Sequence, residues 1–240
     1  IVAQAFATMG AMYPGRVGLG VGTGEPPNEM AVYGGEWPSN NTRLEMLEEA
    51  LTVMNRLWTS DTPISFTGKY YTLRNAVLLT RPKEKVPLYV SAIGLRAANL
   101  AGRLGDHLIT LANNPQYIKD ELFPALETAA RESGRDPNTI ERVGHFSYVY
   151  DPDQVVRPED LQQDAGTISG GAMAKAFLSG VISIFHTEED FIRKIEEMKR
   201  MGYNHLAIAN GSMAIEKGSH IPPDEAPSLK IWADVLPHVR

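Results

Sequence analysis

The strongest constraint on the fold is the repeated order of short apolar strands and amphipathic helices along most of the chain. Each predicted strand is followed by a helix whose apolar residues recur at intervals of three and four. This order, without internal sequence repeats, predicts an α/β fold with a parallel sheet, either doubly wound or closed as a barrel. The expected strands are 16–22, 86–92, 106–111, 141–150 and 205–209, and the expected helices are 1–12, 42–58, 94–104, 115–133 and 187–201.

We favour the barrel, because 240 residues is an ordinary length for a single α/β barrel domain. The expected domain therefore spans residues 1–240. One excursion interrupts the alternation. Residues 64–79 contain two β-rich runs on either side of Thr67-Gly68-Lys69, which predicts a hairpin.

The composition excludes several classes of function. A modest net charge of −6, without basic blocks, argues against a nucleic acid or an anionic membrane surface as a partner. The absence of cysteine removes disulfides, thiolate nucleophiles and zinc–thiolate sites, and it fits a cytoplasmic protein. No apolar run approaches the roughly 18 residues that span a bilayer. The six histidines lack the spacing of metal ligands, so no metal is expected. His107 and His145, on predicted strands, are expected to be packed or hydrogen-bonded, and Trp37 and Trp58 are expected to be packing residues.

The segment GLGVGTGEPPNE at residues 18–29 begins within the first predicted strand, 16–22, and continues beyond its end. It fits neither the G-x-G-x-x-G fingerprint nor a P-loop. In parallel α/β folds the ligand site lies at the carboxyl ends of the strands. The glycines would let a planar ligand approach the backbone, and Pro26 would hold Glu25 in an extended conformation. Glu25 is thus a candidate general acid or base, but a solvated carboxylate on a tight turn explains the pattern equally well.

A second candidate is the segment SAIGLRA at residues 91–97, where another strand end leads into a helix. The free amides and the dipole of the helix start suit an anion such as a phosphate, and Arg96 would add charge. An ordinary strand-to-helix junction has the same sequence pattern, and on this segment alone it is the commoner explanation.

Several strings together resemble the deazaflavin-dependent branch of the bacterial luciferase-like superfamily, nearest to the coenzyme F420-dependent secondary alcohol dehydrogenases and then to the F420-dependent glucose-6-phosphate dehydrogenases. GTGE-x-x-NE together with GEWP is fairly specific to this branch. The resemblance covers nearly the whole chain. The strings are IVAQAFATMGAMYPGRVGLGVGTGE (1–25), GEWP (35–38), FTGKYYTL (66–73), VPLYVSAIG (86–94), LAGRLGDH (100–107), ERVGHFSYVYDPD (141–153) and MGYNHLAIAN (201–210).

The resemblance implies a luciferase-like (β/α)8 barrel that holds F420 at its carboxyl-terminal face and acts on a CH–OH group by hydride transfer. It also implies a homodimer. Glu25 would be the acid–base residue beside the ring. The implied contacts are Thr23, Glu25 and Asn28 for the deazaflavin head group, and Ile93, Gly94, Arg96 and Ala97 for its phosphate tail.

Two departures from the family pattern matter. Family members carry roughly a further third of a barrel ahead of the position of Ile1, including a catalytic His and a pocket Trp. We therefore expect the natural polypeptide to begin earlier, and no residue here takes those two roles. The chain is also shorter than its relatives after Asp153. The competing hypotheses are a flavin mononucleotide (FMN)-dependent monooxygenase of the same superfamily and a non-catalytic deazaflavin carrier.

The substrate expectation follows from missing charges. Binding a sugar phosphate requires fixed cations close to the dianion. The sugar-phosphate relatives carry a Lys and an Arg where this chain reads Leu111-Ala112-Asn113-Asn114 and Ser179-Gly180-Val181-Ile182. Lys175 is the only nearby cation. A small neutral alcohol oxidised to a ketone is therefore the predicted substrate, with a sugar phosphate as the alternative.

Overall fold

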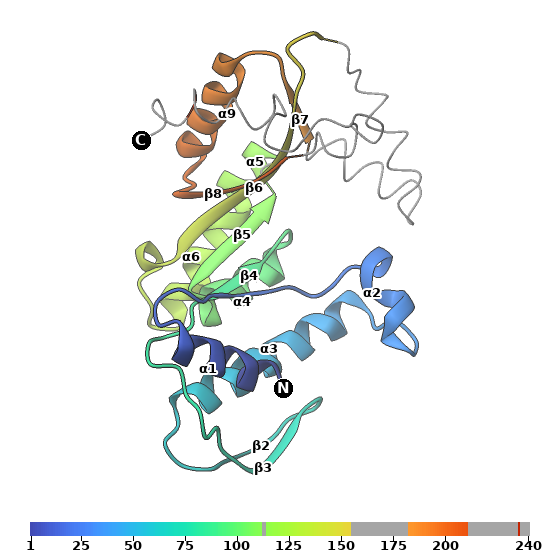
Figure 1. Cartoon of the computed structure of the whole chain (residues 1–240). Coiled ribbons are helices and arrows are strands. Elements are labelled where there is room, and N and C mark those ends of the chain that lie inside the picture. Colours follow the sequence, from blue (N-terminus) through green and yellow to red (C-terminus); the bar gives the residue numbers. More distant parts are fainter. Residues whose placement is uncertain (112–113, 155–181, 211–234, 236–240) are drawn as a thin grey trace, which may run out of the picture. The chain divides into compact units, whose positions relative to one another are not determined.

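The computed structural model describes residues 1–111, 114–154, 182–210 and 235, without the side chains of Pro27, Asn28, Ala31 and Asn210. These residues divide into two compact units. Unit 1 comprises Ile1–Ile109 and Glu121–Glu141, and unit 2 comprises Thr110–Asp120 and the chain from Arg142 onward. The elements are labelled in Figure 1.

The sheet of unit 1 is parallel, as the alternation predicts. Strand β4 (Leu88–Ser91) pairs with β1 (Leu19–Val21) on one side and with β5 (His107–Leu111) on the other. Leu88 and Val90 point into the core and are almost fully buried, because alternate residues of a strand share one face. The three strands therefore end at the same edge.

Four long helices of unit 1 contribute to its core. They are α1 (Val2–Met12), α3 (Asn40–Thr59), α4 (Leu95–Leu104) and α6 (Phe123–Glu132). Helices α1 and α3 lie side by side (Figure 1), and the indole N–H of Trp58 donates to the carbonyl oxygen of Ala3 at 2.8 Å. Trp58 is thus a packing residue, as predicted.

The predicted helix 115–133 forms in three parts. It begins with α5 (Pro115–Tyr117), widens into a π-helix over Ile118–Leu122 and continues as α6. Pro124 has no N–H, and its ring would clash with the carbonyl four residues earlier in a regular α-helix. The wider π-turn just before it accommodates that ring. Gly134, just after this helix, has a φ of +72°.

The predicted hairpin is confirmed as the antiparallel pair β2 (Ile64–Thr67) and β3 (Thr72–Ala76). Its turn is bound to α3 through one carboxylate. Glu49 accepts the backbone N–H groups of Lys69, Tyr70 and Tyr71 at 2.7, 2.9 and 3.1 Å. Donation to an ionised acceptor makes these bonds stronger than neutral ones, so the turn is held firmly against the helix.

In unit 2, the long strand β6 (Glu141–Tyr150) pairs in parallel with β7 (Ile182–Phe185) and with β8 (His205–Asn210). Helix α9 (Glu188–Met201) begins at Thr187 as predicted, and a capping box joins Thr187 and Asp190. The apolar face of the helix is buried, and Gly202 ends the helix with a φ of 97°. The residues of that buried face are Phe191, Ile195, Met198 and Met201.

Two elements are not predicted by the sequence pattern. They are helix α2 (Pro26–Tyr33), which begins with two prolines, and the four-residue strand β7. A short 3-10 turn, Pro137–Thr139, also precedes β6.

We expect Gly102→Ala to lower the free energy of unfolding by about 2 kcal/mol, because α4 and α6 approach closely at this glycine. A Cβ atom there would overlap the carbonyl oxygen of Leu126, which is backbone and cannot rotate away. Urea unfolding of the variant beside the parent protein measures the effect. Gly20→Ala is the matched control, since nothing lies within 4 Å of its Cβ position. Equal unfolding midpoints for Gly102→Ala and the parent would contradict this packing.

Candidate functional site

A cavity of about 840 Å³ lies in unit 1 at the carboxyl ends of β1 and β4. Three stretches line it: residues 22–29 after β1, residues 91–97 after β4, and residues 40–44 at the start of α3. This is the sheet edge at which parallel α/β folds bind ligands. The cavity therefore joins the two segments that the sequence singles out.

The structure brings most of the predicted site residues together in this cavity. They come from two segments some seventy positions apart in the sequence. The side chain of Asn28 lies outside the described residues, although its backbone belongs to α2. The predicted residues that line the cavity are Thr23, Glu25, Ile93, Gly94, Arg96 and Ala97.

Glu25 is the residue that caps the start of α2. Its φ of −127° and ψ of 134° are extended, as the following proline predicts. Proline suits the first turn of a helix, because the N–H that it lacks would have no intrahelical partner there. The side chain of Glu25 is exposed at the cavity, while its backbone N–H donates to the carboxylate of Glu29. A carboxylate thus stands at the cavity on a fixed backbone.

Gly22 and Gly24 lie where the loop packs against neighbouring side chains. Gly24 has a φ of +76°, a conformation that other residues rarely adopt, and the ring of Trp37 lies 3.4 Å from its Cβ position. A Cβ at Gly22 would lie 3.4 Å from the Cβ of Ser91 on the neighbouring segment. The positive φ thus favours glycine at position 24, and the two glycines place no side chain in this part of the cavity wall.

The start of α4 forms the other end of the cavity. Gly94 caps this helix with extended backbone and offers no side-chain acceptor to the amides of the first turn. Nothing lies within 4 Å of a Cβ placed on Gly94, so the space beside these amides is open. Arg96 lines the same space and donates a hydrogen bond to the side-chain oxygen of Asn41. Free amides, the helix dipole and a guanidinium together suit an anion.

Sequence reasoning misses other residues that line the cavity, above all Arg43 of α3. Its Nε donates to the carbonyl oxygen of Thr23 at 2.9 Å, and its guanidinium lies 4.8 Å from the centre of the Trp37 ring. The helical periodicity places Arg43 on α3 but does not show what its side chain contacts. Trp37 also packs edge-on against Tyr33, which confirms its predicted packing role. Asn40 and Leu44 of α3 are missed as well. The remaining lining residues belong to the two segments that the sequence singles out, and they are Gly22, Gly24, Pro26, Glu29, Ser91 and Leu95.

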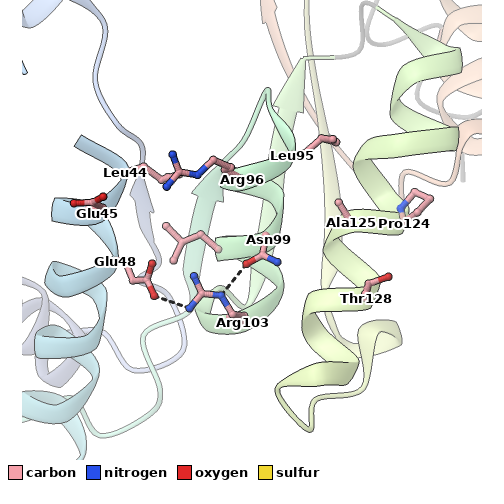
Figure 2. A pocket seen from close by; sticks show the side chains of 11 residues that line it. Leu44, Glu45, Glu48, Leu95, Arg96, Asn99, Arg103, Pro124, Ala125 and Thr128 are labelled. Atoms are coloured by element: carbon pink, nitrogen blue, oxygen red, sulfur yellow. Dashed lines mark hydrogen bonds and ion pairs between the residues drawn. The ribbon is translucent and has the colours of Figure 1, made fainter. Parts of the chain in front are cut away.

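A second cavity, of about 620 Å³, lies between α3, α4 and α6 and is shown in Figure 2. It shares Leu44, Leu95 and Arg96 with the first cavity. Arg103, in contrast, lines only the second one. It donates to Glu48 at 2.6 Å and to Asn99 at 2.8 Å (Figure 2).

These contacts distinguish the two arginines of α4. The hydrogen bond from Arg103 holds the pKa of the Glu48 carboxyl below its usual value, so Glu48 stays ionised and paired. The charge of Arg103 is thus matched within the second cavity, and only Arg96 reaches the first.

The histidines of the described part of the chain take packing roles where the sequence predicts them. The His107 ring lies 4.2 Å from that of Tyr89, and its Nδ1 is 3.2 Å from a carboxylate oxygen of Glu141. His145 is half-buried, and this burial lowers its pKa. Within the described ranges, no three His, Asp or Glu residues are grouped so as to hold a metal ion. Over the same ranges, no helix combines the length and the apolar character needed to cross a bilayer.

Comparison with known proteins gives consistent results. Residues 1–214 match the family described as luciferase-like monooxygenase. The F420-dependent glucose-6-phosphate dehydrogenase of Intrasporangium calvum is 32% identical over 267 aligned residues, which cover all of this chain and 75% of that protein. The enzyme of the same description from Microbacterium testaceum is 40% identical over 154 residues, covering 64% of this chain but only 45% of the relative. The chain thus spans about half the length of some of the curated relatives it matches.

Among solved structures, the chain is similar to an F420-dependent secondary alcohol dehydrogenase in complex with an F420-acetone adduct. The similarity covers all of this chain and 74% of the dehydrogenase chain. The TM-score is 0.83 and the sequence identity is 37%. These likenesses confirm the α/β fold class and the family resemblance predicted from the sequence.

Proposed function

The chain belongs to the luciferase-like monooxygenase family, and we propose that it is a coenzyme F420-dependent oxidoreductase acting on a CH–OH group. Hydride would pass between a small alcohol or carbonyl substrate and the deazaflavin. The observation that carries the proposal is the single cavity in which the glycine loop and the start of α4 meet. The F420 dependence of the similar proteins, as their descriptions state it, supports the choice of cofactor.

The residues present fit this cofactor. At one end, the backbone of Gly22 and Gly24 leaves room for a flat ring system. At the other end, the uncapped start of α4 and Arg96 suit a phosphate. When bound, F420 would supply a ring carbon that accepts or gives a hydride, in place of the flavin's central nitrogen.

The roles we propose for the chain's own residues follow this division. Glu25, fixed at the start of α2, would hold or release a proton beside the ring, which its exposure at the cavity allows. The backbone at Gly94 would hold the phosphate, with the charge of Arg96 added. The head-group contacts are Thr23, Glu25 and Asn28, and the phosphate contacts are Ile93, Gly94, Arg96 and Ala97.

The domain, assembly and location are also proposals. We propose that residues 1–240 form part of a single barrel domain, because the strand–helix order continues through both compact units. A cytoplasmic homodimer is supported by the family resemblance and by a chain without cysteine.

The cofactor is tested by titrating the natural polypeptide separately with F420 and with FMN and following fluorescence. We expect saturable F420 binding that is clearly tighter than FMN binding. Arg96→Ala should weaken F420 binding by roughly tenfold or more, because the phosphate loses a charged partner. Arg103→Ala is the matched control, since it removes a guanidinium of the same helix that lines only the second cavity. Tighter binding of FMN would favour the monooxygenase, and F420 binding without turnover would favour the carrier.

We expect Glu25→Gln to keep F420 affinity within a few-fold and to lower turnover by roughly a hundredfold or more, as for the loss of a positioned acid or base. The substitution preserves the shape of the side chain and removes its titrating proton. Turnover under saturating cofactor is the measurement, and Glu36→Gln, a nearby carboxylate that does not line the cavity, is the control. Unchanged turnover in Glu25→Gln would assign Glu25 a structural role only.

We further propose that the substrate is a small neutral secondary alcohol. The F420-acetone adduct of the similar alcohol dehydrogenase supports this, as does the absence of the Lys and Arg that the sugar-phosphate relatives carry. Of the positions concerned, Ala112, Asn113, Lys175 and 179–181 lie outside the described residues.

Steady-state reduction of F420 should therefore favour isopropanol over glucose 6-phosphate by at least roughly tenfold in kcat/KM, since an unmatched phosphate dianion is costly to desolvate. Glucose without its phosphate is the control that separates the effect of charge from that of size. A higher kcat/KM for glucose 6-phosphate than for isopropanol would overturn the assignment.

A further inference from the structure

Arg43 is placed so that its side chain joins two loops at the edge of the cofactor cavity. Its Nε donates to the carbonyl oxygen of Thr23 at 2.9 Å, and its Nη1 donates to the carbonyl oxygen of Pro38. Its guanidinium also lies over the ring of Trp37, at 4.8 Å from the ring centre. One side chain therefore contacts the glycine loop, the GEWP segment and an aromatic face.

The helix start fixes the base of this side chain. The hydroxyl of Ser39 accepts the N–H of Thr42 at 3.2 Å, and the N–H of Arg43 itself donates to the carbonyl oxygen of Ser39 at 2.9 Å. A guanidinium is planar and stacks on aromatic rings. Because its donors are fixed relative to one another, it loses less conformational entropy for each hydrogen bond than a lysine side chain does. Arg43 is thus a rigid connection between α3 and the loop.

Hydrogen bonds fix the glycine loop on both sides of Gly24, the residue with the positive φ. Thr23, bound by Arg43, precedes Gly24, and the N–H of Glu25 after it donates to Glu29. Gly24 itself has a φ of +76°, and glycine can leave this conformation at little cost. Gly24 has no side chain to restrict its backbone, so the hydrogen bond from Arg43 to Thr23 is needed to keep this conformation.

We propose that Arg43 is the positioning residue of this loop, setting the conformation in which Thr23 and Glu25 meet the cofactor ring. The inference rests on the proposed function, because the loop has this purpose only if the cavity holds the deazaflavin. It goes beyond that function in assigning to α3 the side chain that shapes the ring end of the site.

A control of the same chemistry lies on the same helix. Arg56 donates to the carbonyl oxygen of Ser65 at 3.5 Å and lies 5.8 Å from the centre of the Phe66 ring. It thus joins α3 to β2 by the same kinds of contact, but it lines neither cavity. The comparison set is Arg43→Ala, Arg43→Lys and Arg56→Ala, made in the natural polypeptide.

The first measurement is the Kd for F420, from cofactor fluorescence. Arg43→Ala should raise the Kd by roughly tenfold or more, the scale of a lost hydrogen bond to a charged group, whereas Arg56→Ala should stay within about twofold. Arg43→Lys keeps the charge but cannot reach both carbonyl oxygens, so its Kd should be intermediate. Added guanidinium ion should restore part of the affinity of Arg43→Ala and none in the other variants. If Arg43→Ala does not fold, Arg43→Lys carries the test.

The second measurement is amide hydrogen exchange without cofactor. Arg43→Ala should speed the exchange of the Glu25 amide, whose bond to Glu29 depends on the loop conformation, while Arg56→Ala should leave it unchanged. Unchanged exchange in Arg43→Ala would overturn the inference. Faster exchange with an unchanged Kd would overturn it too, because the loop would then be held without effect on the cofactor. If the parent protein binds no F420, the proposed function fails, and the exchange result still decides whether Arg43 holds the loop.

Discussion

The parallel pairing of β1 with β4 is the constraint on which the site depends. Leu19, Gly20 and Val21 lie opposite Leu88, Tyr89 and Val90, so both strands end at the same edge. In an antiparallel pair the two following segments would leave at opposite edges. The glycine loop and the start of α4 therefore face one cavity because the two strands that directly precede them are paired in parallel. The buried side chains of Leu88 and Val90 fix this register, since a shift of one residue would turn them out of the core.

Sequence periodicity predicts the elements whose signals are local. The boundaries of β6 are as predicted, and α9 starts at Thr187 because a capping box and a first turn of acidic residues act within a few positions. Helix α2 escapes prediction because consecutive prolines usually mark a break. At the first turn of a helix, however, their missing N–H groups cost nothing.

The candidate site is partly readable from the sequence. Glycines and a carboxylate at a strand end make this segment a candidate ligand loop, although a tight turn with a solvated carboxylate explains the pattern equally well. The family resemblance adds a role for each residue. Arg43 could not be found in this way. Its partners are the backbone carbonyl oxygens of Thr23 and Pro38, which every residue type carries, so no pattern of side chains marks the contact. The sequence thus predicts the residues that would face the ligand, but it does not predict Arg43, which fixes the loop that carries them.

The contacts that fix the neighbouring loops and helices come from α3. Its apolar periodicity predicts only a packing role for this helix. Its polar side chains bind the glycine loop through Arg43, the hairpin turn through Glu49 and α4 through Glu48. Because Gly24 has a positive φ and the start of α4 has no side-chain cap, the shape of the cavity depends on contacts from neighbouring elements as well as on the side chains that line it. A site built from glycines and helix-start amides can bind a flat, anionic ligand closely only if neighbouring elements remove the freedom that glycine brings. In this fold α3 does so, and the same helix that fills the core also makes the ligand loop rigid.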